Sequence, residues 1–251
     1  MSVGIDLSGK VAVVTGGSRG LGLEMSRALA DAGANVVVAS RNAVTCHEVA
    51  REITEDTGVR ALGVGAHVGR WDGVEDAVTE ILDEFGRIDV LINNAGIAPT
   101  YDSLETATEA LFDKTIDVNL KGPFRLSTLV APRMPEGGSI VNVSSIASVR
   151  PKTTDLIYAA AKSGLNVLTK GIAQAYGPRV RCNTIMAGPF LTEISEVWYT
   201  DEWRERAKSF PLGRAGRPDE IVGTALYFAS DLSSFTTGTV LPVDGGRTAM
   251  T

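Results

Sequence analysis

Short runs of apolar and β-branched residues alternate along this chain with longer segments of helical periodicity, and this alternation limits the possible folds more than any other feature. Strands and helices that alternate in this way favour a parallel sheet with helices on both of its faces. The short runs predict strands at 11–15, 35–39, 61–66, 88–92, 139–143 and 180–185. The periodic segments predict helices near 20–32, 42–57, 71–86, 107–132 and 157–176.

The predicted fold class is therefore α/β, a doubly wound (Rossmann) parallel sheet of about seven strands with helices on both faces. A hydrophobic content of 44% and a charged content of 22% fit an ordinary globular chain. A length of 251 residues fits a single domain, 1–251. The segment at about 190–217 is rich in charged and aromatic residues. Because ligands of such sheets bind beyond the carboxyl ends of the strands, we expect this segment to cover the site.

Composition argues against several classes of function. A net charge of −6 without a Lys- and Arg-rich stretch does not suit a nucleic-acid partner. The apolar runs are far shorter than the roughly 20 residues that cross a bilayer. Residues 1–10 do not resemble a secretion signal, so we expect no membrane segment and a cytoplasmic protein. Cys46, Cys182, His47 and His67 have no metal-ligand, disulfide or triad spacing, so no metal site is expected.

The first predicted strand runs into a glycine-rich turn and then into a helix. In such a turn the backbone can approach a pyrophosphate closely, and the free N–H groups of the helix start stabilise its charge. The spacing Gly-x3-Gly-x-Gly differs from the Gly-x-Gly-x-x-Gly fingerprint, and an ordinary tight strand-to-helix connection would also explain the glycines. The residues predicted to bind the phosphates are Thr15, Gly16, Ser18, Arg19, Gly20, Leu21 and Gly22.

The end of the second predicted strand bears on the choice between NADP(H) and NAD(H). An acidic residue at this point binds the ribose hydroxyls of NAD, whereas NADP needs a cation for its 2′-phosphate. This strand ends in Ser40-Arg41, and Arg19 can reach the same point from the turn. Charge-assisted hydrogen bonds from these arginines favour NADP(H), and NAD(H) remains possible. The alternative is that Arg41 only begins a solvated helix.

Tyr158 and Lys162 are four residues apart at the start of a predicted helix, which puts both side chains on one face. A neighbouring ammonium favours the phenolate, so we expect the pKa of Tyr158 to be lowered from about 10. Tyr158 would then serve as a proton donor and acceptor. Taken alone, this spacing is more typical of surface patterning. Ser144-Ser145 and Asn93-Asn94-Ala95-Gly96, which follow two other strands, point instead to a shared site.

With these motifs, essentially the whole chain resembles the classical short-chain dehydrogenase/reductase family, including bacterial 3-oxoacyl-acyl carrier protein reductases and gluconate 5-dehydrogenases. The resemblance implies hydride transfer between a nicotinamide dinucleotide and a carbonyl or secondary alcohol. Tyr158 would protonate the carbonyl oxygen as acid/base while Ser145 hydrogen-bonds that oxygen. Lys162 would bind the nicotinamide ribose and tune Tyr158, and Asn119 would support a proton-relay water.

The resemblance also implies contacts with the adenosine half of the cofactor. Asn94, Ala95 and Gly96 match the family segment that lies beside the adenosine. His67 and Val68 stand where the family usually has an acid that contacts the adenine amino group. His67 is equally well explained as a hydrogen-bonded residue at a strand end.

The segment after the strand at 180–185 corresponds to the family segment that fixes the nicotinamide carboxamide. Gly188, Phe190 and Thr192 are the matching residues, although Ala187 replaces the family's proline and leaves the backbone less restrained. The segment 238–246 resembles the last strand and turn that many members use in a homotetramer interface. A homotetramer or a homodimer is therefore expected by analogy.

Trp198, Tyr199 and Trp203 lie among charged residues between 194 and 210, which suits a helical flap that closes an aromatic face over the substrate. Packing in the core or between subunits explains these aromatics equally well. The small-molecule substrates left open are 3-oxoacyl thioesters, sugar acids such as ketogluconates, cyclic ketones and steroid-like alcohols.

The leading interpretation is an NADP(H)-dependent oxidoreductase acting on a carbonyl or secondary alcohol. The alternative is a non-catalytic dinucleotide-binding module that senses redox state or regulates a partner, and a structural scaffold comes third. A pure sensor has no chemical need for Tyr158, which favours the enzyme.

Overall fold

The computed structural model describes residues 4–195 and 200–250 of the chain. Within them lie the strands β1 (Val11–Thr15), β2 (Asn35–Ser40), β3 (Ala61–Gly65), β4 (Val90–Asn93), β5 (Gly138–Ser145), β6 (Val180–Ala187) and β7 (Val240–Val243). They form one sheet in the order β3-β2-β1-β4-β5-β6-β7, and every neighbouring pair is parallel. The winding reverses between β1 and β4, which confirms the predicted doubly wound α/β fold and its seven strands.

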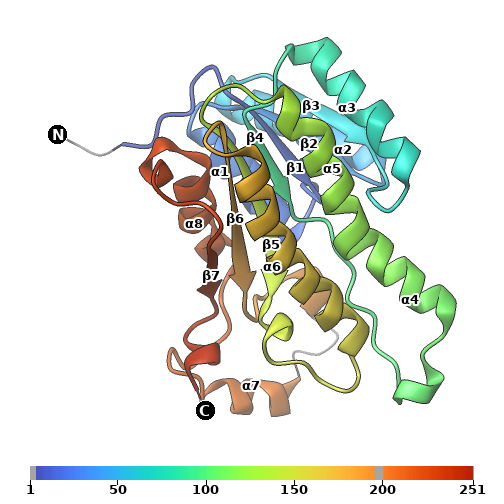
Figure 1. Cartoon of the computed structure of the whole chain (residues 1–251). Coiled ribbons are helices and arrows are strands. Elements are labelled where there is room, and N and C mark those ends of the chain that lie inside the picture. The colour runs from blue at the N-terminus through green and yellow to red at the C-terminus, as the bar shows by residue number, and fades with distance from the viewer. Residues whose placement is uncertain (1–3, 196–199, 251) are drawn as a thin grey trace.

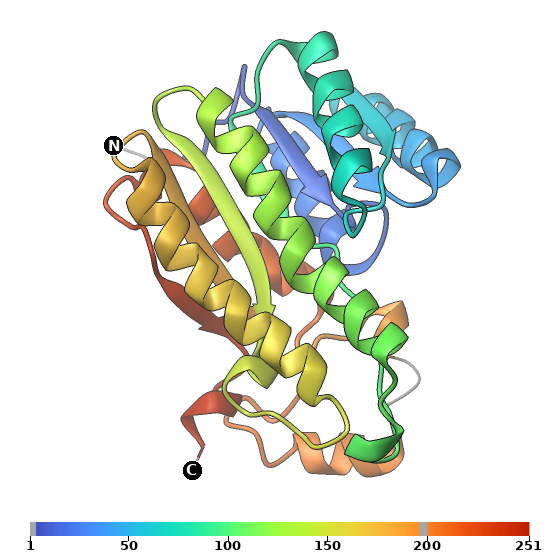
Figure 2. The same ribbon diagram turned by 45° about the vertical axis from the view of Figure 1, so that its right-hand side comes forward.

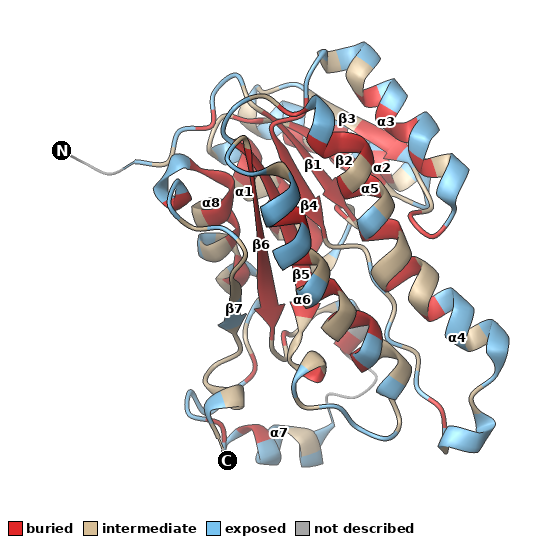
Figure 3. Cartoon of the chain, viewed as in Figure 1, coloured by how far each residue is buried: buried red, intermediate tan, exposed pale blue. Residues whose placement is uncertain are grey.

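The helices are α1 (Gly20–Asp31), α2 (Ala43–Thr57), α3 (Trp71–Phe85), α4 (Glu109–Ile116), α5 (Gly122–Val130), α6 (Leu156–Tyr176), α7 (Asp201–Ala207) and α8 (Val222–Ala229). They cover both faces of the sheet (Figure 1). Successive strand residues point to opposite faces, so Val14 and Val38 join the core under α1, α2 and α8, whereas Val13 and Val37 join the core under α3, α5 and α6. The inner strands are largely buried, whereas the edge strands β3 and β7 are partly exposed (Figure 3). No described helix is long and apolar enough to cross a membrane.

The predicted helix at 107–132 begins later and is not uniform. Thr108 caps its start, because the Thr108 hydroxyl accepts the N–H of Leu111 at 3.2 Å. α4 then passes into a π-helical turn, Asp117–Lys121, before α5 begins. Such turns are rare and are frequently found at functional sites. This turn carries Asn119.

Strand ends also differ from the prediction. β5 and β6 continue two residues beyond 143 and 185, because their pairing runs in register as far as Ser145 opposite Ala187. β4 is shifted to Val90–Asn93 from the predicted 88–92. Ser145 is therefore the last paired residue of β5, where the strand meets the crevice.

The described parts of the segment at about 190–217 lie beyond the carboxyl ends of the strands. In two views, α7 is found below the strand tips, near the turn at Leu104–Thr106 (Figures 1 and 2). Trp203 on α7 packs edge-on against the buried ring of Phe210, with 5.8 Å between ring centroids. Trp198 and Tyr199 lie outside the described residues, so the aromatic flap over the substrate stays a prediction.

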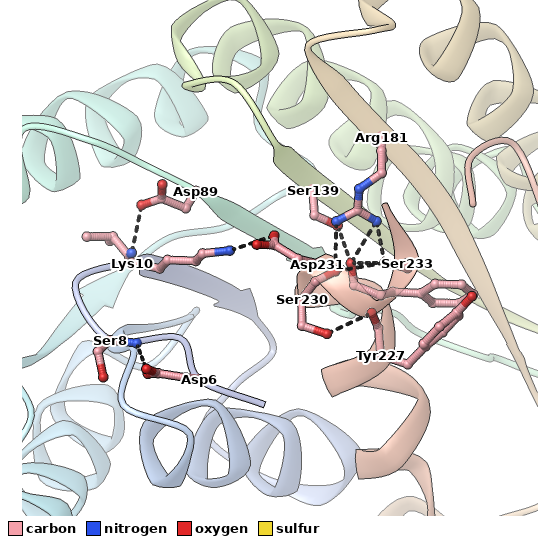
Figure 4. A network of polar contacts seen from close by, with 12 residues as sticks. Asp6, Ser8, Lys10, Asp89, Ser139, Arg181, Tyr227, Ser230, Asp231 and Ser233 are labelled. Atoms are coloured by element: carbon pink, nitrogen blue, oxygen red, sulfur yellow. Dashed lines mark hydrogen bonds and ion pairs between the residues drawn. The ribbon is translucent and has the colours of Figure 1, made fainter. Parts of the chain in front are cut away.

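At the amino ends of the strands, buried polar groups pair with one another (Figure 4). The carboxylate of Asp89, just before β4, accepts the N–H of Val11 and the Nε–H of Arg87, each at 2.9 Å. Arg181 on β6 donates to two main-chain oxygens at the end of α8, at 3.1 and 3.2 Å.

Candidate active site

The turn between β1 and α1 requires glycine at three positions. Gly16 and Gly20 have positive φ angles of 65° and 53°, a region that L side chains rarely adopt. A Cβ atom on Gly22 would lie 2.1 Å from the carbonyl oxygen of Gly16. Arg19 stands at the N-cap of α1 without a capping side-chain hydrogen bond, so the first N–H groups of the helix, at Gly20, Leu21 and Gly22, can bind an anion.

Thr15 and Asn94 hold this turn against β4. The Thr15 hydroxyl accepts the N–H groups of Asn94 and Ala95 at 3.0 and 3.1 Å. The Asn94 side chain donates to the carbonyls of Thr15 and Gly16 at 2.9 and 3.2 Å. These residues, predicted to contact the cofactor, therefore shape the phosphate turn at the point where the winding of the sheet reverses.

Ser40 and Arg41 lie at the end of β2, next to the turn. The Ser18 hydroxyl donates to the Ser40 hydroxyl at 3.1 Å, which joins the turn to the strand end. Arg41 is exposed. Within the described part of the chain, neither Arg19 nor Arg41 forms an ion pair, whereas Arg27 nearby pairs with Glu52. The pair of arginines thus keeps its charge available for an anion.

His67 lies just after β3. Its Nδ1 atom accepts the N–H of Gly69 at 3.2 Å, which makes it a hydrogen-bonded residue of a strand-end turn. Val68 is buried, and its carbonyl oxygen would lie 2.5 Å from a Cβ on Gly122. An adenine contact of His67 or Val68 stays a prediction. In the residues that the structure describes, no three His, Cys, Asp or Glu side chains gather to bind a metal.

The end of β5 and the start of α6 bring together Ser145, Tyr158 and Lys162. The Ser145 hydroxyl lies close enough to the Tyr158 phenol to lower its pKa. The Nζ atom of Lys162 lies 5.7 Å from the centre of the Tyr158 ring. Lys162 is 3% exposed and donates to the carbonyl of Val143 at 2.8 Å. The Ser144 hydroxyl donates to the Lys162 carbonyl at 3.2 Å; sequence motifs missed these supports because a main-chain acceptor has no residue signature.

The predicted direction of the Tyr158 pKa is wrong for this chain. Burial raises the pKa of Tyr158, and it outweighs the opposing hydrogen bond from Ser145, while the nearby charge of Asp155 raises it further. Burial also lowers the pKa of Lys162 from its ordinary 10.5 to about 8. Low-dielectric surroundings penalise the charged form of each group, so burial has a larger effect than their proximity. The phenol is therefore held protonated, as a proton donor.

Asn119 lies in the π turn and is fully buried. Its Nδ2 atom donates to the carbonyls of Ile97 and Thr115, each at 2.9 Å. A Cβ on Gly96 would lie 2.9 Å from the Asn119 Oδ1 atom and 3.6 Å from the Lys162 Nζ atom. Gly96 thus lets the segment after β4 approach both side chains, which joins Asn119 to the group of Ser145, Tyr158 and Lys162.

At Ala187, where the family has a proline, packing and sheet pairing fix the start of the segment after β6. Ala187 pairs on both sides within the sheet, and a Cβ on Gly188 would lie 2.5 Å from the Cα of Asp244. Phe190 forms an isolated parallel bridge with Gly216. The hydrogen bonds of this bridge come from the neighbours of Phe190, because Leu191 donates its N–H to Gly216 and Pro189 accepts the N–H of Gly216. The ring of Phe190 is buried, and its own N–H points away from Gly216. The backbone of Phe190, rather than its ring, can therefore contact a ligand.

Thr192 faces the glycine-rich turn. A Cβ on Gly20 would lie 3.5 Å from the Thr192 Cγ2 atom. The main chain of Thr192 is fixed by Ser195, whose hydroxyl accepts its N–H at 2.8 Å and donates to its carbonyl at 2.7 Å. A cavity of about 400 Å³ opens beside this contact. It is lined by Gly20, Leu23, Glu24, Leu191, Thr192, Glu193, Ser195 and Pro218.

Known proteins share this sequence and geometry over nearly the whole chain. Residues 16–248 match the family model described as enoyl-(acyl carrier protein) reductase. The chain is 38% identical over 246 residues to L-rhamnose 1-dehydrogenase (NAD(P)(+)) of Azotobacter vinelandii, which covers 94% of this chain and 96% of that protein.

Solved structures agree with this match. A protein of Sinorhizobium meliloti described as a short-chain alcohol dehydrogenase superposes with a TM-score of 0.93 and 34% identity, covering 98% of this chain and 99% of that one. A blue fluorescent protein from a metagenomic library, crystallised in complex with NADPH, gives a TM-score of 0.90 and 32% identity, covering 96% and 98%. The likeness extends from the phosphate turn to the last strand.

Proposed function

This chain belongs to the short-chain dehydrogenase/reductase family, an oxidoreductase family, and we propose that it transfers hydride between NADP(H) and the carbonyl or secondary alcohol of a small molecule, with Tyr158 as acid/base. The observation that carries the proposal is the convergence of Ser145, Tyr158 and Lys162 at the carboxyl end of β5. A bound nicotinamide supplies or accepts the hydride. The residues of the chain have to bind the substrate oxygen and move its proton.

The proton chemistry follows from the local environment. A phenol that is held protonated can give its proton to a carbonyl oxygen as negative charge develops there. The Ser145 hydroxyl, which lies beside the phenol, can hydrogen-bond the same oxygen. Among the described residues, Lys162 has one acceptor, the carbonyl of Val143, so its remaining protons are available for ribose hydroxyls. Asn119 holds the π turn beside this group and would support the water that returns the proton.

The cofactor preference that we propose is NADP(H). Arg41 follows the end of β2 and Arg19 lies in the turn before α1, and neither forms an ion pair among the described residues. Ser40 ends β2 at the point where an acid would favour NAD. The complex of a structural neighbour with NADPH agrees with this choice. The name of the Azotobacter relative includes both cofactors, so NAD(H) is the second candidate.

We also propose a homo-oligomer. Phe235 is fully exposed, and Leu232 and Leu241 are 45% and 39% exposed near the edge strand β7. An apolar edge strand that meets water is a typical site of association. A second copy of the chain is the natural occupant, as the family resemblance implies.

A carbonyl panel tests the proposed activity. The probes are an acetoacetyl thioester, 5-ketogluconate, cyclohexanone and a 3-oxosteroid, each followed by loss of NADPH absorbance. We expect turnover of at least one probe and a fall in kcat of about 10³-fold in Tyr158→Phe, the range typical of general acid catalysis, with NADPH binding retained. NADPH binding without turnover of any probe, or full activity in Tyr158→Phe, would contradict the proposal and favour the sensor.

A further inference from the structure

The stripe of α6 that carries Tyr158 and Lys162 continues for one more turn to Asn166. Residues four apart lie on one face of a helix, so Tyr158, Lys162 and Asn166 all face the end of β5. The Asn166 side chain reaches a short turn, Ile146–Ser148, that follows directly on Ser145. Helix α6 is therefore connected to the segment after Ser145 at a point remote from Tyr158.

Ser148 is the centre of this connection. Its hydroxyl donates to the carbonyl of Ser145 at 2.6 Å and accepts the Nδ2–H of Asn166 at 3.0 Å. Among the described residues, the competing acceptor for its proton is the sulfur of Met186, which is more distant at 3.4 Å and is a weaker acceptor. The Ser163 hydroxyl also donates to the carbonyl of Ser148 at 2.7 Å, so α6 holds the turn at two points.

The polarity of Asn166 determines the direction of these bonds. A hydroxyl has one proton, and because Asn166 acts as donor, that proton is free for the Ser145 carbonyl. Donating to Ser148 leaves Asn166 in an unfavourable arrangement, because its Oδ1 atom is buried without a hydrogen-bond partner among the described residues. A buried unpaired amide oxygen costs about 1–3 kcal/mol and needs a compensating reason.

The turn at Ile146–Ser148 also contacts the Ser145 hydroxyl directly and orients it. The Ser145 Oγ atom accepts the N–H of Ala147 at 3.1 Å, so the position of its lone pairs follows the position of the turn. We propose that Asn166 and Ser148 are positioning residues, which hold the Ser145 carbonyl and thereby aim the Ser145 hydroxyl at the substrate oxygen. This inference rests on the proposed function, because it assigns Ser145 its role in catalysis.

The isosteric change Asn166→Asp tests the proposal. A carboxylate can only accept, so it draws the Ser148 proton away from the Ser145 carbonyl while the side chain keeps its shape. With the fastest of the four carbonyl probes, we expect kcat to fall about tenfold, because small displacements of a positioning group have large effects on rate. The KM of the probe and the Kd of NADPH should remain unchanged. Ser148→Ala should behave in the same way, and Ser148→Thr, which keeps the hydroxyl, should restore most of kcat.

Ser139→Ala is the matched control. Ser139 lies at the opposite end of the same strand, is fully buried, and donates to the carbonyl of Phe228 at 2.7 Å. Its loss should lower Tm about as much as Ser148→Ala and leave kcat unchanged. If both variants lower Tm and neither lowers kcat, Ser148 has only a structural role and the inference is wrong.

A cycle with Ser145→Ala separates this inference from the proposed function. In the Ser145→Ala background, Asn166→Asp should cause no further loss of kcat, because its effect passes through Ser145. An unchanged tenfold loss in that background would overturn the positioning role. If Ser145→Ala and Tyr158→Phe both kept full turnover, the proposed function itself would fail. The Ser148→Ala and Ser148→Thr pair decides the inference if Asn166→Asp does not fold.

Discussion

Polar groups are hydrogen-bonded within the protein at the amino end of the parallel sheet, whereas donors are left open at its carboxyl end. At the amino end, the Asp89 carboxylate and the Arg181 guanidinium are bonded to main-chain groups and to neighbouring side chains (Figure 4). At the carboxyl end, the start of α1 has no capping side chain, and Arg19 and Arg41 form no ion pair among the described residues. Hydrogen bonds that the fold completes by itself stabilise it, whereas donors that it leaves open are available to a ligand.

The two buried cations illustrate this difference. Arg181 at the amino end donates to two carbonyls at the end of α8, where the helix dipole favours positive charge. Burial lowers the pKa of Arg181, but the charge of Asp231 opposes this effect. Lys162 at the carboxyl end has the single carbonyl of Val143, and burial lowers the pKa of Lys162 to about 8. Groups of the protein therefore offset much of the cost of burying the charge of Arg181, whereas the charge of Lys162 is offset less.

The largest expected effect on stability comes from Lys162→Met. Below about pH 8 the folded chain has to bury a charged Lys162, because the pKa of this group falls from 10.5 to about 8 on folding. Each pKa unit corresponds to about 1.4 kcal/mol, so Lys162→Met should raise the free energy of unfolding by about 3 kcal/mol near pH 7. Turnover should be lost at the same time. Urea unfolding without cofactor, beside the carbonyl assay, measures both.

The pH dependence provides the control for that prediction. Between about pH 8 and pH 10.5 the unfolded chain binds more protons at Lys162 than the folded chain does, so wild-type stability should rise across this window. The advantage of Lys162→Met should shrink over the same window. A constant difference between the two proteins from pH 7 to about pH 10 would show that charge burial is not its cause.

At the amino end, Arg181→Met should have the opposite outcome. The change removes charge-assisted hydrogen bonds to the end of α8, which contribute about 2 kcal/mol, and leaves the carboxyl end untouched. The free energy of unfolding should fall by this amount, and kcat per folded molecule should stay at the wild-type level. An unchanged free energy of unfolding, or a lower kcat, would remove the functional contrast between the two ends of the sheet.

Sequence reasoning predicted the fold well because a doubly wound sheet is built from local periodicity. It also predicted Ser145, Tyr158 and Lys162 from a strand end and a helix spacing, and the family resemblance added Asn119 to this group. It failed for the pKa of Tyr158, because the local spacing reveals the neighbouring ammonium and not the depth of burial. Sequence reasoning also did not predict contacts between residues that only the tertiary fold brings together.

Two features, the contact of Asn166 and the π turn, could not be predicted from the sequence. Asn166 continues the helical stripe of Tyr158 and Lys162, so a signal existed, but only the structure shows that its amide meets Ser148. The π turn at Asp117–Lys121 has no period of its own in a helix of ordinary composition. Register and main-chain geometry decide these features, and neither can be read from residue type.

The smallest expected effect, Arg41→Asp, tests whether the open donors of the carboxyl end serve a 2′-phosphate. Arg41 is exposed, so the change should leave the free energy of unfolding within about 0.5 kcal/mol of wild type. Replacing a cation by an acid beside a phosphate should raise the Kd of NADPH about tenfold or more, which corresponds to the loss of one charge-assisted hydrogen bond. The Kd of NADH should stay level or fall, because an acid at this point can bind the ribose hydroxyls. Fluorescence titration of both cofactors measures the ratio, and equal changes for NADPH and NADH would mean that Arg41 contributes only general charge.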